Sequence, residues 1–536
     1  MSAELIVEGR IATLAGERGF GWVDAIAIEG RRVTAAGSRA EVDAARGPTS
    51  RNLRLAPDEV AIPGLTDAHL HLADVDLSAG RVDLRPAQTL TDALARIAEL
   101  NAQLPVGAWL QGHGWSPDRW DGWPTADDLS TAAPGRRICL WSHDHHTLWV
   151  SHTALRAAQI GLDTTDPAGG CIRRLADGSP SGILHENATQ LVTALIPAPT
   201  RDEYASGIRK TAADLLALGI VAVHDPGLLA LEPGLGPAID AYRTLSERED
   251  LPIRVHACIR ESQLEAAIET GLRSGDHLSP PNRRLRFGWL KLFADGTLGS
   301  GTAALLDPSA GTGIWTTDPK ALIRLAADAS DHGIATMIHA IGDAAVRAAL
   351  AALEPTSGKT PLMPRVEHVQ LLDPADTPRF ARGGVAASVQ PIHLRADGPL
   401  ARRRWGDRAD ERGYPLTSLV QAGATLAFGT DAPVESFDPW PGIELAVTRR
   451  SPEWPVSTVR FGPHEALAVD LALRAACLGG PVAAGEQDRG RLVPGQRADL
   501  AVVPAAALDE PVEVGGLLGR VRPRLVFVDG EVTFEA

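Results

Sequence analysis

The stretch that decides the fold is AIPGLTDAHLHLAD, residues 61–74, in which an apolar run ends in His69 and His71. Side chains alternate between the two faces of a strand, so residues two apart point the same way. Both imidazoles are therefore expected on one side of a sheet or inside a barrel. The question they raise is which other side chains meet them there.

The middle of the chain repeats the order strand, then helix. Short β-rich runs alternate with Ala- and Leu-rich helical segments such as 343–353. The runs are 61–71, 219–225, 253–259, 285–296, 334–343, 365–369, 385–391 and 425–434. Strands of this number and order are typical of an α/β fold of the (β/α)8 TIM-barrel type. An open doubly wound parallel sheet is the alternative.

The two ends of the chain differ from the middle. Residues 1–59 and 483–536 both read as short strands separated by turns, which predicts one small composite β-sandwich domain from both termini. Residues 60–482 would form the barrel, with a large insertion after strand one at about 75–205. That span is far longer than an ordinary βα connection. We expect the insertion at the carboxyl face of the barrel, where active sites of such barrels lie.

Composition excludes several classes of protein. The chain of 536 residues carries a formal net charge of −15, which argues against nucleic acid or an anionic membrane as partner. No apolar run approaches the ~18 residues of a membrane span, and no secretory signal is visible. Only 4 cysteines in such a chain fit a reducing, cytoplasmic location. The expected partners are a small-molecule substrate and, at most, a second copy in a homodimer.

Ligand-type side chains recur at or near the ends of the predicted strands. Besides the opening pair they are Lys291, His339, His368 and Asp431. The carboxyl ends of barrel strands converge on one rim, so these groups are expected close together. Imidazole and carboxylate are ligands that zinc, iron and manganese accept, and a buried lysine there needs a partner. A single histidine would more often be structural, but the joint pattern predicts a metal site.

These residues resemble the signature of the amidohydrolase superfamily, with H-x-H on strand one, Lys on four, His on five and six, and Asp on eight. Longer motifs look like amidohydrolase family 3, the branch that includes N-substituted formamide deformylases. They are IPGLTDAHLH (62–71), LKLFADGTLGSG (290–301), HAIGDAAV (339–346), RVEHVQLL (365–372) and FGTDAPVESFDPW (428–440). The resemblance covers nearly the whole chain.

The resemblance implies a metal centre with one or two divalent ions, zinc being favoured. It implies that His69 and His71 hold one metal with Asp431 nearby, and that His339 and His368 hold a second. Lys291, carboxylated by CO₂, would bridge the two. In the mononuclear alternative Lys291 stays unmodified and some of the histidines bind substrate. Asp431 would also act as general base and return the proton to the leaving amine.

Three further residues are expected in the substrate pocket. DHHTLWV (144–150) matches a family pattern, which implies that His146 binds substrate or stabilises an oxyanion. His113 and Glu186 are expected to line the pocket, and a structural role is the alternative for each of the three. The chain departs from the family pattern at three positions, with His145 in place of the usual Gly, Ser151 in place of Asn and Gly301 in place of Arg, so the resemblance does not imply the identity of the substrate.

The predicted function is hydrolysis of a C–N amide-type bond, for example in an N-substituted formamide, by metal-activated water. Two alternatives stay open. The same scaffold supports lyase, isomerase or decarboxylase chemistry, because fold does not determine reaction. A non-catalytic binding protein is the other alternative, although all six proposed ligands are present.

Overall fold

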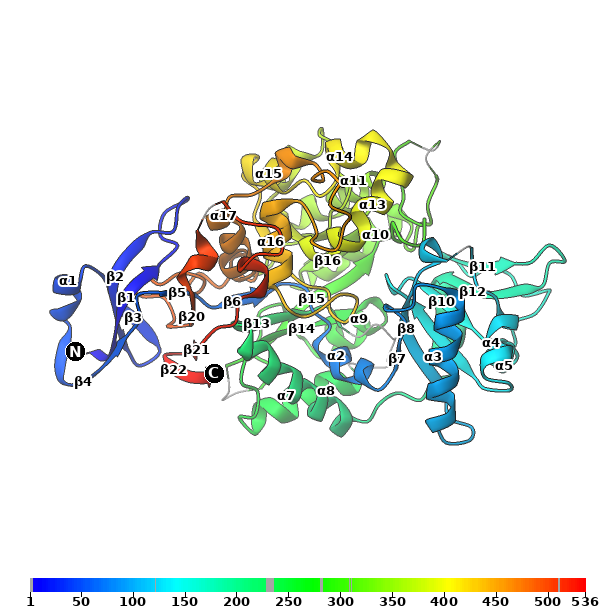
Figure 1. Cartoon of the computed structure of the whole chain (residues 1–536), viewed down its shortest axis with the longest axis horizontal. Coiled ribbons are helices and arrows are strands. Elements are labelled where there is room, and N and C mark those ends of the chain that lie inside the picture. Colours follow the sequence, from blue (N-terminus) through cyan, green and yellow to red (C-terminus); the bar gives the residue numbers. More distant parts are fainter. Residues whose placement is uncertain are drawn as a thin grey trace.

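The computed structural model describes residues 3–536 except 121, 228–235, 280–282, 308, 310 and 510. A parallel barrel occupies the middle of the molecule (Figure 1). Its strands are β6 (Leu65–Asp67), β13 (Ile220–Asp225), β14 (Arg254–Arg260), β15 (Leu285–Phe293), β16 (Thr336–Ala340), β17 (Arg365–His368), β18 (Ala386–Val389) and β19 (Leu426–Phe428). They neighbour one another in chain order, with no reversal of strand order. The barrel prediction is confirmed, and the doubly wound alternative is excluded.

The first and last barrel strands approach each other closely and nearly close the sheet. The Ala68 amide donates a hydrogen bond of 2.9 Å to the Phe428 carbonyl, and the Asp431 amide donates one of 2.6 Å to the His69 carbonyl. A Cβ added at Gly429 would lie 2.6 Å from the His69 nitrogen, so only glycine fits there. This contact places the two strand ends, and the residues after them, side by side.

Helices follow the strands and cover the outside of the barrel (Figure 1). They include α2 (Leu72–Ala79), α7 (Arg201–Ala217), α8 (Gly236–Glu247), α9 (Leu264–Glu269), α10 (Pro319–Asp331), α11 (Asp343–Leu353), α12 (Thr377–Gly383) and α16 (Trp440–Thr448). Their apolar residues and those of the strands form one large buried cluster. The start of α10 follows from its sequence. The Asp318 carboxylate accepts hydrogen bonds from amides in the first turn, and Pro319 is the first helical residue.

The predicted first strand, 61–71, is divided in the structure. Only β6 belongs to the barrel, whereas β5 (Glu59–Pro63) pairs with strands from both ends of the chain. The division falls at Gly64, where an added Cβ would lie 2.7 Å from the Val221 side chain. The close approach lets the chain pass directly from one sheet into the other.

Both ends of the chain contribute to a second sheet of eight strands. From the N-terminal side come β1 (Ala3–Ala12), β2 (Trp22–Glu29), β3 (Arg32–Gly37), β4 (Arg46–Arg54) and β5, and from the C-terminal side β20 (Leu500–Pro504), β21 (Leu525–Val528) and β22 (Glu531–Glu535). The blue and red strands of Figure 1 thus belong together. A buried cluster of its own supports this sheet. Its description as a separate β-sandwich domain stays a prediction.

A third sheet lies within the long connection between β6 and β13. Its strands are β7 (Val82–Asp83), β8 (Leu110–Trp115), β9 (Ile138–Ser142), β10 (Thr147–Val150), β11 (Gly170–Arg174) and β12 (Pro180–Glu186). Two buried clusters support it, one rich in tryptophan and the other mainly aliphatic. The turn between β9 and β10 reaches the barrel, and its residues lie beside the site described next.

Among the helices that the structure describes, none combines the length and the apolar character required to cross a membrane.

Candidate metal centre

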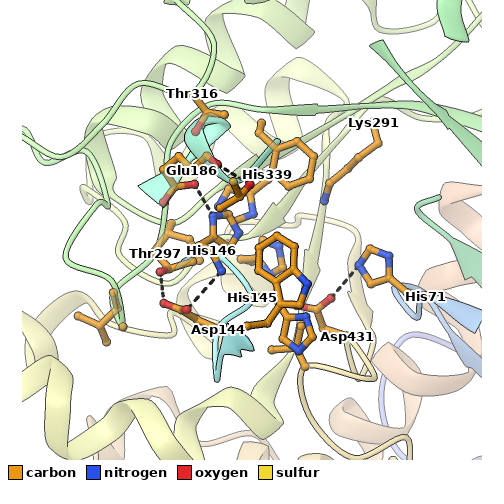
Figure 2. Close-up of a pocket in the computed structure, with 18 of the residues that line it drawn as sticks. His71, Asp144, His145, His146, Glu186, Lys291, Thr297, Thr316, His339 and Asp431 are labelled. Atoms are coloured by element: carbon orange, nitrogen blue, oxygen red, sulfur yellow. Dashed lines mark hydrogen bonds and ion pairs between the residues drawn. The ribbon is translucent and has the colours of Figure 1, made fainter. Parts of the chain in front are cut away.

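The predicted ligand side chains gather at the carboxyl end of the barrel. They are His69 and His71 after β6, Lys291 in β15, His339 in β16, His368 at the end of β17 and Asp431 after β19. All six are buried, and all line one cavity of about 450 Å³. Figure 2 labels four of them, His71, Lys291, His339 and Asp431. A cavity of this size suits a small-molecule ligand.

The first ligand group consists of His69, His71 and Asp431. Nε2 of His69 lies 3.4 Å, and Nε2 of His71 3.3 Å, from Oδ1 of Asp431. Figure 2 shows the contact between His71 and Asp431 as a dashed line. On the other side of each ring, Nδ1 of His71 donates to the Gly227 carbonyl at 2.6 Å, and Nδ1 of His69 contacts Glu367 at 2.5 Å. Such contacts orient imidazoles and leave both Nε2 atoms facing one point.

The second ligand group consists of His368, His393 and the same Asp431. Nε2 of His393 lies 3.4 Å from Oδ2 of Asp431. The two imidazoles stack with ring centres 5.9 Å apart. Within the described part of the chain, Nδ1 of His368 and Nε2 of His393 have no hydrogen-bond partner. Buried polar atoms of this kind are normally satisfied, so these two fit a site that binds an ion.

The second ligand group contains His393, whereas the resemblance implies His339 as the partner of His368. The ring of His339 lies 4.6 Å from that of His368, but its Nε2 faces the Gly296 carbonyl at 3.1 Å. His393 was missed because it lies in a short 3₁₀ turn, Pro391–His393, beyond the end of β18. The available signal was that the predicted seventh strand, 385–391, lacked a ligand-type residue at its end.

Lys291 is buried beside both ligand groups, and Nζ lies 4.9 Å from the centre of the Phe293 ring. Burial lowers the pKa of Lys291 to about 8, although Glu367 and Asp431 act in the opposite direction. Desolvation disfavours the ammonium form of any buried lysine. The neutral amine is therefore more populated near neutral pH than in an exposed lysine, although the ammonium form still predominates.

A chain of contacts through the barrel interior holds His69. Glu367, which contacts its Nδ1, also pairs with Arg365 at 2.7 Å between Oε1 and Nε. The Arg365 guanidinium lies 4.1 Å from the ring centre of Trp289 and bonds Nδ1 of His224 at 2.9 Å. His224 is thus a packed interior histidine. Burial lowers the pKa of His69 well below its usual value, so its ring is neutral, as a metal ligand requires.

Two aspartates fix the backbone around the ligands. The Asp67 carboxylate accepts hydrogen bonds from the amides of His69 (3.0 Å) and Thr430 (3.1 Å), which joins the two ends of the barrel sheet. Burial raises the pKa of Asp67 to about 7. Asp295 accepts the amides of Ile341 and Gly342, at 3.0 and 2.9 Å, and so holds the loop after β16.

The insertion contributes the roof of the cavity. Nδ1 of His146 lies 2.6 Å from Oε2 of Glu186, and Oε1 of Glu186 accepts a bond of 2.6 Å from Thr302 (Figure 2 shows His146 and Glu186). Burial opposes protonation of His146, but Glu186 and Asp144 outweigh it and raise its pKa. The ring lies 4.8 Å from that of His339, so His146 reaches the metal-ligand region.

His113 lies farther from the cavity. It is buried, its ring centre lies 5.8 Å from that of His145, and His145 is the one of the two that lines the cavity. Burial and the charge of Arg85 lower the pKa of His113 to about 4. Contact of His113 with a substrate stays a prediction, whereas His146 and Glu186 both line the cavity.

Comparison with known proteins agrees with this geometry. A model described as Amidohydrolase family matches residues 56–534. N-substituted formamide deformylase of Arthrobacter pascens is 25% identical over 532 residues, with 95% of each chain covered. Protein LONG AFTER FAR-RED 3 of Arabidopsis thaliana is 29% identical over 522 residues, which cover 94% of this chain and 88% of that protein.

A solved structure shares the fold over most of the chain. The crystal structure of an uncharacterized metal-dependent hydrolase from Pyrococcus horikoshii OT3 superposes with a TM-score of 0.73 at 25% identity, covering 93% of this chain and 97% of that one. The family model, the barrel and the ligand groups agree in supporting a metal-dependent hydrolase. The chain belongs to the Amidohydrolase family.

Proposed function

We propose that the protein hydrolyses a C–N amide-type bond in a small molecule, an N-substituted formamide being the first candidate. The observation that carries this proposal is the convergence of two histidine pairs on one carboxylate, Asp431, in the wall of one cavity. The relative named N-substituted formamide deformylase supports both the bond type and the substrate class. The four cysteines are free, which supports a cytoplasmic location.

The donor set fits a divalent metal, with zinc favoured. Neutral imidazole nitrogens and a carboxylate are ligands that zinc accepts. His69, His71 and Asp431 would hold one ion, and His368 and His393 a second with the same Asp431. A bound ion would polarise the amide carbonyl and lower the pKa of a water molecule.

Lys291 is proposed to carry a carboxyl group. Its neutral amine would attack CO₂, forming an N–C bond and releasing one proton, and the product is an anion with two oxygen donors. The lowered pKa of Lys291 supports this step, because only the neutral amine is nucleophilic. The anion would bridge the two ligand groups, with His339 beside it. A single ion with unmodified Lys291 is the alternative.

Asp431 is proposed to move the proton. Its two carboxylate oxygens face different ligand groups, at 3.3–3.4 Å from three imidazole Nε2 atoms. From there it accepts the proton of the attacking water and delivers it to the amine nitrogen as the C–N bond breaks. The hydrogen bond from its amide to the His69 carbonyl fixes the backbone at this point.

His146 is proposed to bind the substrate carbonyl oxygen. Its contact with Glu186 engages Nδ1, so Nε2 is the ring atom that stays available to donate to the substrate. The raised pKa of His146 supports a protonated donor. A donor aimed at the developing negative charge stabilises the transition state. Glu186 thus acts through His146. His113 lies beside His145, which lines the cavity.

Product analysis in labelled water tests the reaction class. The zinc-loaded protein is incubated with a panel of N-alkyl- and N-arylformamides in H₂¹⁸O. We expect the free amine and formate carrying one ¹⁸O atom. A product without ¹⁸O would favour the lyase, isomerase or decarboxylase alternative. Stoichiometric metal with no turnover of any amide would favour a binding protein.

A further inference from the structure

Arg260 is the last residue of β14 and lines the same cavity as the predicted metal ligands. Among the described residues that line this cavity it is the only arginine, and Lys291 is the only lysine. Burial lowers the pKa of Arg260 to about 10, although Asp74 and Asp225 act in the opposite direction. The guanidinium is therefore still a cation near neutral pH.

The Arg260 guanidinium has neither an ion pair nor a hydrogen bond in the described part of the chain. Its contact is with an aromatic ring, since Cζ lies 4.4 Å from the centre of the Phe293 ring. The bond to the Gln263 side chain comes from the backbone amide of Arg260. The Asp225 carboxylate accepts the Tyr242 hydroxyl instead. Charged groups this far from bulk water are normally paired, so an arginine without a partner points to a ligand.

Two nitrogens of the Arg260 guanidinium are accessible. Nη1 has essentially no accessible surface and no partner among the described residues, but Nε and Nη2 are not enclosed in this way. The side chain as a whole is half-buried, and both it and the Phe293 ring beneath it line the cavity. Nε and Nη2 form one edge of the guanidinium, and two parallel N–H groups on such an edge match the two oxygens of a carboxylate.

A single phenyl ring separates Arg260 from the predicted metal centre. The Phe293 ring that contacts the guanidinium also lies 4.9 Å from Nζ of Lys291, and its centre lies 5.2 Å from that of the His339 ring. Lys291 and His339 are both labelled in Figure 2. A substrate whose amide lies at the ligand groups can therefore reach Arg260 through a short substituent that passes along this ring.

Most acidic side chains in the cavity wall have partners other than Arg260. These pairs are Asp144 with Ser300, Glu186 with His146, Asp397 with Tyr414, Asp431 with His71, and Glu435 with His143. Glu261 also lines the cavity, but its side chain is exposed. Because Lys291 lies beside the ligand groups, Arg260 is the cation in this wall that is available to an anionic part of a ligand.

We propose that Arg260 determines substrate specificity by binding a carboxylate of the substrate through Nε and Nη2. Phe293 fixes the plane of the guanidinium for this contact. The inference rests on the proposed function and narrows its substrate class. A formyl group carries no further substituent, so the carboxylate belongs to the amine part of the substrate. Arg260 acts in recognition and takes no part in bond cleavage.

Binding of uncleavable keto acids tests this assignment independently of hydrolysis. The probes are 4-oxopentanoate, 5-oxohexanoate and 6-oxoheptanoate, each compared with the methyl ketone in which an uncharged isopropyl group replaces the carboxylate. None of these compounds has a C–N bond, so the zinc-loaded protein binds them without turnover. Calorimetry gives the two Kd values of each pair. Their ratio measures the preference for the carboxylate at one spacer length.

Arg260→Met is the informative variant, because an unbranched thioether keeps the packing on Phe293 and removes the charge. We expect the preference for carboxylate to fall by about 10–100-fold at the best-fitting spacer, the usual effect of losing a charged hydrogen bond. Arg260→Lys keeps the charge without the two parallel donors, so it should retain part of the preference. The matched control is Arg273→Met, exposed between β14 and β15, which should keep the wild-type ratio.

Dependence on the spacer distinguishes a contact from a long-range attraction between charges. An unchanged ratio in Arg260→Met would overturn the inference. So would a loss that is equal at all three spacer lengths and absent in Arg260→Lys. Both results would leave amide hydrolysis intact. Conversely, a protein that hydrolyses no amide but shows the expected ratios would overturn the proposed function and retain Arg260 as the recognition residue.

Discussion

At the scale of single residues, Asp431 is the group that both ligand groups share. One of its oxygens faces His69 and His71, and the other faces His393. A carboxylate with this placement can ligate metal and exchange protons with substrate. Its neighbours in turn depend on residues behind them, of which Glu367 is the most closely coupled to a ligand.

Asp431→Asn removes the charge and the proton acceptor but keeps the shape. We expect kcat to fall by about 10²–10⁴-fold, the usual contribution of a positioned acid–base group. Steady-state kinetics on the best formamide of the panel measures this. Asp250→Asn, on the exposed surface, is the control and should leave kcat unchanged. A variant at Asp431 with wild-type kcat would exclude the proposed role.

Glu367→Gln tests whether orientation of His69 matters. The change weakens the contact to Nδ1 and removes the charge that pairs with Arg365. We expect zinc affinity to fall by about 10–100-fold, as for other groups that orient metal ligands. Competition with a chromophoric chelator measures it on protein that circular dichroism shows to be folded. The exposed Glu247→Gln should retain wild-type affinity, and equal affinity in both variants would contradict the role.

The sequence predicts residues that lie at strand ends better than residues that lie beyond them. The order of strands was enough to bring His69, Lys291 and Asp431 to one rim. His393 was not predicted as a ligand because a 3₁₀ turn brings it back to that rim, and a hydrophobic pattern does not indicate the geometry of a turn. The contact of Arg260 with Phe293 joins distant chain segments, so it too is visible only in the structure.

At the scale of elements, the β9–β10 hairpin connects the insertion to the barrel. His143 Nε2 lies 3.1 Å from Oε1 of Glu435, and Oε2 of Glu435 pairs with Arg395. Glu435 follows β19, so the contact fixes the hairpin beside Asp431. The sequence predicts an insertion near the site from its position in the chain, but not which loop enters the cavity.

The hairpin contact predicts a pH dependence. Burial would raise the pKa of Glu435, but His143 and Arg395 outweigh it and lower that pKa to about 2, from 4.5. Its stabilising contribution is therefore present above pH 4.5 and lost as the pH falls toward 2. For His143, Glu435 outweighs burial and raises the pKa above 6.5, so that contribution is present below pH 6.5 and lost as the pH rises through the raised value.

Glu435→Gln should flatten this dependence at both ends. Melting temperatures between pH 3 and 9, followed by circular dichroism, measure it. We expect the largest difference between the variant and the wild type in the mildly acidic range, where both partners are charged. Parallel pH profiles for the two proteins would contradict the contact.

At the scale of the whole molecule, charged side chains join the barrel to the sheet made from both chain ends. Arg254 in β14 bonds Asp499 at 2.8 Å and also pairs with Asp529, and all three are buried. Asp499 and Asp529 flank the C-terminal strands β20 and β21. The alternation of strands and helices predicts the barrel. The strand-rich sequence at both ends of the chain predicts a shared domain, but it does not show which strands pair, because those contacts join residues far apart in the chain.

Arg254→Ala should loosen this junction. The change removes the common partner of two buried carboxylates, but Asp499 keeps Arg489 and Asp529 keeps Arg497, so we expect the loss of a charged hydrogen bond, about 1.5–3 kcal/mol. Guanidinium unfolding followed by tryptophan fluorescence measures the loss. Arg248→Ala, on the exposed surface, should change the free energy of unfolding by less than about 0.5 kcal/mol. Equal stability of the two variants would show that the junction does not depend on Arg254.

If the cavity around Asp431 is a hydrolytic metal centre, activity must depend on bound metal. The most direct measurement follows bound metal and formamide hydrolysis in the same samples while the protein is stripped by a chelator and then titrated with zinc in bicarbonate buffer. We expect turnover to disappear with the metal and to return in proportion to the zinc bound, up to one or two ions per chain. Turnover that persists in fully stripped protein, or saturating zinc that restores none, would contradict it.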